Sequence, residues 1–198
     1  MKFLKENSYD IVRLYINQIG ITIFSLVLYT SISFIEDTSL NLQLKVALSV
    51  FASIFYFALL YTASWEYGAK DRIKIDSGRI KYMPFKGTLI SLAANAPNFI
   101  LAIFTIITMA IYLSAGIDGF NTAFAIFNLL LRFTNSMFLG FLQGIFSFIT
   151  DVNTSHIWQS VGYLVMPLFS VLVTQIGYTF GEKNIRIFSA FAQKPDRE

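Results

Sequence analysis

The sequence predicts an all-α integral membrane protein with four transmembrane helices and one further amphipathic segment that is re-entrant or interfacial. Of its 198 residues, 55% are hydrophobic and only 14% are charged, whereas soluble domains carry about 25% charged residues. Four apolar runs are long enough to cross a hydrocarbon layer of about 30 Å as helices. These runs are residues 14–35, 46–64, 89–113 and 157–180. The segment 120–151 is also apolar but carries a stripe of polar side chains.

The first two runs have clear boundaries. The first follows Arg13 and stops before Glu36 and Asp37, and the second ends at Trp65 and Tyr67, aromatic residues of the kind found at membrane interfaces. The basic N-terminus lacks a short apolar core followed by a small-residue cleavage site. We therefore expect it to be retained and not cleaved as a signal peptide.

The runs 89–113 and 157–180 each contain a proline, Pro97 and Pro167. Neighbouring helices can satisfy the carbonyl that such a proline frees. Pro97 is flanked by Asn95 and Asn98, which leaves two interpretations of this part of the third run. The helix opens and offers amides to a ligand or ion, or it kinks and the two asparagines bond to neighbouring helices.

The segment 120–151 has polar side chains at steps of 3, 4 and 7 residues, which places them on one face of a helix. Its candidate ligand or lipid contacts are Asn128, Arg132, Asn135 and Gln143. No Asp or Glu lies inside the apolar runs. In an upright helix, Arg132 would lie about 18 Å deep without a carboxylate at its own depth, at a cost of about 2.5–3.5 kcal/mol.

Three geometries are open for this segment. It lies flat at the outer interface as an amphipathic helix, or it dips into the membrane as a pair of short helices over residues 120–131 and 137–149. Alternatively it crosses fully, with the stripe lining a polar cavity. In the crossing geometry Arg132 contacts an anion or a headgroup, and in the flat geometry it is an ordinary interfacial arginine.

The loop charges predict the orientation. The loop 65–87 holds Lys70, Arg72, Lys74, Arg79, Lys81 and Lys86, and the tail 182–198 is also basic. The links 114–122 and 151–159 hold no Lys or Arg. By the positive-inside rule, we expect a protein of the cell membrane whose two termini and loop 65–87 lie on the cytoplasmic side. This requires the segment 120–151 to begin and end on the same, outer side.

Basic and apolar residues alternate on either side of Asp76-Ser77-Gly78, which predicts a small β-hairpin against the membrane. The loop's predicted membrane-surface or partner contacts are Lys70, Arg72, Lys74, Arg79 and Lys81. Such cations attract anionic lipid headgroups. The alternative is that these basic residues only determine the orientation of the chain in the membrane.

A faint internal repeat links the two halves of the chain. Residues 67–75 and 180–187 both contain an aromatic residue and a glycine, then a lysine, then isoleucines around a basic residue. Asn17 and Asn95 are 78 positions apart, and Gly68 and Gly181 are 113 positions apart. The difference is about the length of the segment 120–151. The chain therefore reads as two parallel helix hairpins, the second carrying an insertion, as in some transporters.

The residue types disfavour catalysis. There is no cysteine and one histidine, His156, so thiolate and most histidine-based sites are excluded. The motifs of hydrolases, zinc proteases and P-loop NTPases are missing. We expect a non-enzymatic, transport-related or accessory subunit of a larger membrane assembly, without cofactor, metal or nucleic acid, whose partners are the lipid bilayer and a second copy or another membrane subunit. A small channel or lipid-interacting protein is the alternative, and an intramembrane enzyme is a third.

Overall fold

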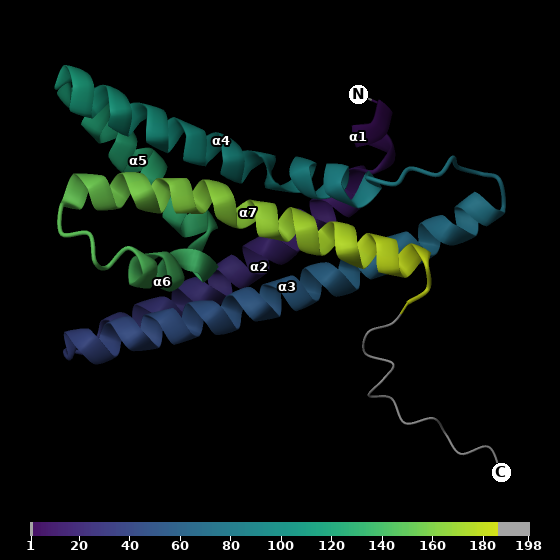
Figure 1. Cartoon of the computed structure of the whole chain (residues 1–198), viewed down its shortest axis with the longest axis horizontal. Helices are drawn as coiled ribbons and strands as arrows, with labels where there is room; N and C mark the ends of the chain where they lie inside the picture. The colour runs from purple at the N-terminus through teal and green to yellow at the C-terminus, as the bar shows by residue number, and fades with distance from the viewer. Residues whose placement is uncertain (1, 186–198) are drawn as a thin grey trace, which may run out of the picture.

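The computed structural model describes residues 2–185, and within that range the chain is helical without strands (Figure 1). The helices are α1 (Lys2–Glu6), α2 (Ser8–Ser33), α3 (Thr38–Asp76), α4 (Lys86–Ala115), α5 (Asp118–Thr134), α6 (Ser136–Ile145) and α7 (Val152–Glu182). Four of them, α2, α3, α4 and α7, are long and apolar enough to cross a membrane. The predicted fold class is confirmed.

The four long helices lie side by side along the molecule and alternate in direction (Figure 1). One end of the bundle, here called the basic end, contains α1, residues 77–85 and the end of α7. The other, here called the far end, contains the links 34–37, 116–117 and 146–151. The first described residues and the end of α7 therefore share one end of the bundle.

Helices α5 and α6 form a pair bent by 109° at a break of one residue, Asn135. Helix α5 leaves the far end beside α4, and the link after α6 returns to the far end, where α7 begins (Figure 1). The pair enters and leaves the bundle at the same end, so it is re-entrant with respect to the four long helices. Of the three geometries open for the segment 120–151, this is the pair of short helices.

The break is held by hydrogen bonds from two neighbouring helices. The Thr22 hydroxyl donates to the Thr134 carbonyl at 2.9 Å, and the Thr22 carbonyl accepts from the Ser136 hydroxyl at 2.7 Å. The Ser49 hydroxyl of α3 accepts from the Gly140 N–H at 2.9 Å. The Asn135 side chain itself donates to the Leu131 carbonyl, a local bond with which asparagine competes against helix continuation.

The polar residues at the break face the bundle. Asn135 and Ser136 are buried, whereas Leu129, Leu130 and Phe133 are exposed. The rest of the stripe does not share this burial: Asn121 is exposed, and helix α5 itself buries the apolar Phe124 and Leu131. The inward direction of the polar side chains is therefore confined to the break.

Helices α3 and α7 approach each other closely through small residues. A Cβ atom added to Gly68 would collide with the Tyr178 carbonyl, and one added to Gly181 would collide with the Trp65 carbonyl. Gly177 likewise faces the Ser64 hydroxyl. Pairs of small residues four apart on both helices allow the backbones to meet, which drives association in lipid, where burial of apolar surface contributes little.

These contacts support the predicted repeat. Tyr178 and Gly181 lie 113 positions after Trp65 and Gly68, and Gly68 meets Tyr178 as Gly181 meets Trp65. Reciprocal contacts of this kind are expected when two equivalent surfaces are related by a two-fold axis. Here the two surfaces belong to two segments of one chain, α3 and α7. Helices α2 and α4 also begin 78 positions apart, at Ser8 and Lys86. The α5–α6 pair is then the insertion in the second hairpin.

The two long helices that begin at the far end, α3 and α7, start with an aspartate cap of the same kind. The Asp37 carboxylate accepts from the Leu40 N–H, the Ser39 hydroxyl and the Ser39 N–H, and Asp151 accepts from the Thr154 N–H. The bond from the Leu40 N–H, followed by those from Ser39, holds the pKa of Asp37 below its ordinary value. An aspartate at this position satisfies N–H groups that the helix leaves free.

The predicted β-hairpin is wrong. Helix α3 continues through Asp76, and Gly78, with φ of +71°, ends it where the hairpin turn was expected. Arg72 pairs with Asp76 at 2.8 Å, one helical turn away, and such pairs stabilise a helix and not a strand. Residues 186–198 of the predicted basic tail 182–198 lie outside the described residues.

Candidate functional site

A chain of buried amides meets the tip of the re-entrant pair. Asn135 Nδ2 donates to Asn98 Oδ1 and Asn98 Nδ2 donates to Asn95 Oδ1, both at 3.4 Å. Asn95 Nδ2 continues the chain to the Ser91 carbonyl at 3.0 Å. None of these four residues is more than 3% exposed. Asn135, Asn98, Asn95 and Ser91 are called the amide chain below.

The amide chain lies in the middle of a long helix. Asn98 follows the start of α4 at Lys86 by 12 residues and precedes its end at Ala115 by 17, about 18 and 26 Å by helical rise. Polar side chains at such depth are uncommon, face the protein interior and mark solute or ion pathways. Helix α4 is continuous through Pro97. Asn95 bonds to Ser91 and Asn98 within α4, and Asn98 also accepts from Asn135 at the break of the pair.

The amide chain has one unused acceptor. Asn135 is 0% exposed, and its Oδ1 atom has no hydrogen-bond partner. A buried polar atom without a partner costs about 1–3 kcal/mol. Its position at the break between two half-helices resembles the arrangement by which transporters bind substrates and ions. The tip therefore holds a buried hydrogen-bond acceptor that no described residue uses.

Arg132 is anchored to α7 without a carboxylate. Its Nη2 atom donates to Gln159 Oε1 at 2.9 Å and lies 3.2 Å from His156 Nδ1. Because a guanidinium only donates, His156 Nδ1 accepts and the ring proton belongs on Nε2. None of the ion pairs between described residues includes Arg132.

The guanidinium lies nearer the far end than an upright helix would place it. His156 and Gln159 follow the start of α7 at Val152 by 4 and 7 residues, about 6 and 10 Å by helical rise. The bend of the pair and the length of the arginine side chain bring the charge outward, as snorkelling does. The depth of about 18 Å for an upright helix therefore does not apply.

The remaining stripe residues are separate from the amide chain. Gln143 Oε1 accepts from the Tyr29 hydroxyl at 2.5 Å, which ties α6 to α2. Asn128 is half-buried and forms no hydrogen bond with a described residue. The structure thus brings Asn135 together with Asn95 and Asn98. Arg132 and Gln143 bond to other helices, and Asn128 forms no hydrogen bond with a described residue.

A buried ion pair at the basic end was missed by sequence reasoning. Asp71 Oδ2 lies 2.6 Å from Lys86 Nζ and accepts from the Tyr178 hydroxyl at 3.0 Å. The side chains of Asp71 and Lys86 are 5% and 14% exposed. The available signal was the spacing of three residues from Gly68 to Asp71, which puts both on one helix face. That signal is informative only once α7 is known to cover this face.

The five predicted surface cations divide into two groups. Lys70 and Arg72 point outward and pair with Glu66 at 4.0 Å and Asp76 at 2.8 Å. The other three line a cavity at the basic end, and they are Lys74, Arg79 and Lys81. Three of the five predicted cations thus share one cavity.

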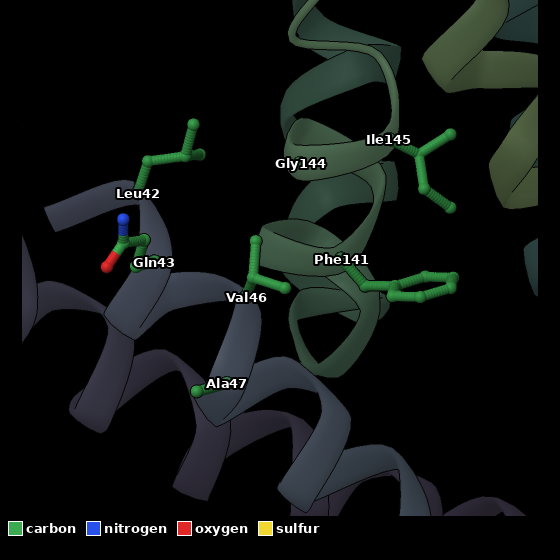
Figure 2. A pocket seen from close by; sticks show the side chains of 7 residues that line it. All are labelled: Leu42, Gln43, Val46, Ala47, Phe141, Gly144 and Ile145. Carbon is green, nitrogen blue, oxygen red and sulfur yellow. The ribbon is translucent and has the colours of Figure 1, made fainter. Parts of the chain in front are cut away.

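An apolar groove lies between the start of α3 and α6. The groove has a volume of about 510 Å³ and is lined by residues of both helices. Figure 2 labels Leu42, Val46 and Ala47 on α3 and Phe141 and Ile145 on α6. A second cavity of about 420 Å³ is also lined by Phe141 and Ile145. The lining of both is almost wholly apolar, which suits acyl chains and not polar solutes.

No model of a known protein family matches the chain, and no curated protein or solved structure matches it. Among the described residues there is no group of three or more His, Asp or Glu side chains that could hold a metal ion. The chemistry that the amide chain offers is hydrogen bonding by neutral groups, and Arg132 adds one cation toward the far end.

Proposed function

We propose that the protein is a non-enzymatic, transport-related membrane protein whose amide chain binds a small polar solute or a cation at the tip of the re-entrant pair. The observation that carries this proposal is the unpaired Oδ1 of buried Asn135, in line with Asn98 and Asn95 at mid-depth. The unused group is an acceptor, so a cation or a donor-bearing solute complements it and an anion does not.

The amide chain also has a direction that suits passage of such a solute. It leads from the break at Asn135 to Ser91, which lies five residues, about 8 Å, from the start of α4 at the basic end. Four long helices leave little room for an alternating-access site within one copy. We therefore propose that the protein acts as a subunit of a larger assembly, with a second copy or another membrane protein.

Flux through reconstituted vesicles tests this proposal. We expect purified protein, alone or with the partners that co-purify from its native membrane, to conduct sodium, potassium or glycerol. Asn135→Leu removes the acceptor and the contact to Asn98, and we expect a loss of at least about tenfold, the equivalent of one contact worth 1.4 kcal/mol. Asn128→Leu, on the same stripe but outside the amide chain, serves as the matched control with unchanged flux.

A second variant separates loss of the site from loss of the fold. Asn135→Asp keeps the shape of the side chain and adds a negative charge, so we expect conduction to shift toward cations. Flux that is indifferent to both Asn135 variants would contradict the proposal. So would a preparation that shows neither flux nor a partner.

A lipid-interacting role is the second proposal, favoured by the apolar groove between α3 and α6 (Figure 2) and by Arg132 near the far end. Movement of fluorescent phospholipids between leaflets of the same vesicles separates the two proposals. Lipid movement lost in Arg132→Gln but retained in Asn135→Leu would favour the lipid role.

We propose that the basic end faces the cytoplasm of a cell membrane, in accord with the positive-inside rule. Because the chain has no cysteine, single cysteines can be introduced and labelled from outside intact cells. We expect Ile117→Cys at the far end to react with a membrane-impermeant maleimide, and Ile80→Cys at the basic end to react only after lysis. The opposite pattern would invert the topology.

A further inference from the structure

The cavity at the basic end lies where all four long helices converge. Its volume is about 660 Å³, and its lining comes from α1, the ends of α2, α3, α4 and α7, and the loop between α3 and α4. This is within the size range of small-molecule sites. The lining includes both cationic and anionic side chains together with the apolar Phe3, Ile80 and Met83.

Some of the charged side chains that line the cavity form ion pairs with one another, and others do not. Asp71 is neutralised by Lys86 at 2.6 Å and by Lys74 at 3.6 Å. Arg79 and Lys81 line the same cavity but take part in no ion pair between described residues. Lys86 and Lys74 are thus paired with Asp71, whereas Arg79 and Lys81 are available to a ligand.

Two further acidic residues, Glu6 and Asp10, line the cavity. Glu6 takes part in other interactions, so Asp10 is the acidic residue that remains. Asp10, near the start of α2, is half-buried in the wall of the cavity and makes no hydrogen bond or ion pair with a described residue. A purely anionic ligand would leave this carboxylate unmatched, and a purely cationic one would face Arg79 and Lys81. The complementary ligand carries both charges.

We propose that this cavity binds an amino-phosphate group, with the phosphate on Arg79 and Lys81 and a primary ammonium on Asp10. Arginine and lysine together provide a fork of donors and a point charge for phosphate. The cavity lies at the end of the bundle, where lipid headgroups are found, and its apolar wall suits the start of an acyl chain. A phosphatidylethanolamine headgroup has this chemistry, and so does soluble O-phosphoethanolamine.

Lipid titration of the full-length protein, followed by native mass spectrometry, tests the proposal. We expect phosphatidylethanolamine to bind about tenfold more tightly than either of two other lipids. The ammonium of phosphatidylcholine cannot donate a hydrogen bond, and phosphatidylglycerol has no ammonium. A tenfold difference in affinity corresponds to about one charge-assisted hydrogen bond. The double variant Arg79→Gln with Lys81→Gln should lower the affinity for phosphatidylethanolamine about tenfold or more.

Asp10→Asn supplies the sharper readout. It should reduce binding of phosphatidylethanolamine to the level of phosphatidylglycerol and leave phosphatidylglycerol unaffected. Arg72→Gln and Asp76→Asn change the same charges at the same end of the molecule but outside the cavity, and we expect them to bind as the native chain does. Melting temperatures measured without lipid identify any variant that has lost its fold.

Competition with O-phosphoethanolamine identifies the source of the ligand. Displacement at equal concentration would assign the site to the soluble compound, and failure to displace would assign it to the lipid. Equal affinity for the three lipids would overturn the proposal, as would equal losses in Arg72→Gln and in the Arg79 and Lys81 double variant. The cavity is separate from the amide chain, so either result leaves the transport proposal unaffected.

Discussion

Substitution of Gly181 by leucine will prevent stable packing of α3 against α7. A Cβ at this position would meet the Trp65 carbonyl and backbone, which cannot move aside as a flexible side chain can. Overpacking costs about 1–3 kcal/mol and more when a backbone is displaced. Because the contact is with backbone, we expect a loss of at least about 3 kcal/mol.

Unfolding in increasing concentrations of a denaturing detergent, followed by circular dichroism, measures this loss. Gly20→Leu is the matched control, because a Cβ at Gly20 meets nothing within 4 Å. We expect Gly20→Leu to fold at least as well as the native chain, since glycine is a poor residue inside a helix. Equal stability of the two variants would show that α3 and α7 do not pack as described.

Asp71→Leu will produce the second large loss. The substitution leaves the Lys86 ammonium and the Tyr178 hydroxyl without their shared acceptor. Removal of one partner from a buried ion pair costs about 3–5 kcal/mol, and the open cavity beside Lys86 lets water reduce this. We expect a loss of about 3 kcal/mol in the same unfolding measurement.

Two control variants test whether the loss in Asp71→Leu comes from the buried ion pair. Asp76→Leu removes a carboxylate from the same helix, but its pair with Arg72 is exposed, and exposed pairs contribute about 0–1 kcal/mol. Adding Lys86→Met to Asp71→Leu should restore most of the lost stability, since no buried charge is then left alone. A double variant no better than Asp71→Leu alone would mean that the carboxylate acts through some other contact.

The amide chain shows how far single-sequence reasoning reaches. Asn95, Asn98 and Asn135 are recognisable as candidates because amides are uncommon inside long apolar runs. That they form one hydrogen-bonded chain is not recognisable from the sequence, because Asn98 and Asn135 are 37 positions apart and meet only when α5 returns along α4. Asp71 was overlooked for a related reason, since it looks like an ordinary loop residue until Tyr178 covers it.

The β-hairpin predicted around Gly78 failed because two local signals compete there. Alternating apolar and basic residues suit a strand, whereas charge pairs at a spacing of four suit a helix. The pair between Arg72 and Asp76, together with the long helix already propagating from the membrane, favours the helix. Extending an existing helix needs no new nucleus, whereas a hairpin must be started afresh.

The amino-acid sequence alone predicts four apolar helices, a fifth apolar segment that differs from them, and basic residues gathered at alternate loops. These properties depend on hydropathy and charge, which act residue by residue on transfer between water and lipid. The bend at Asn135, the burial of Asn135 and Ser136, and the partners of Arg132 and Asp71 emerge only when the helices pack together. Those depend on packing and hydrogen bonding between segments distant in the chain, because in lipid such contacts, and not burial of apolar surface, hold helices together.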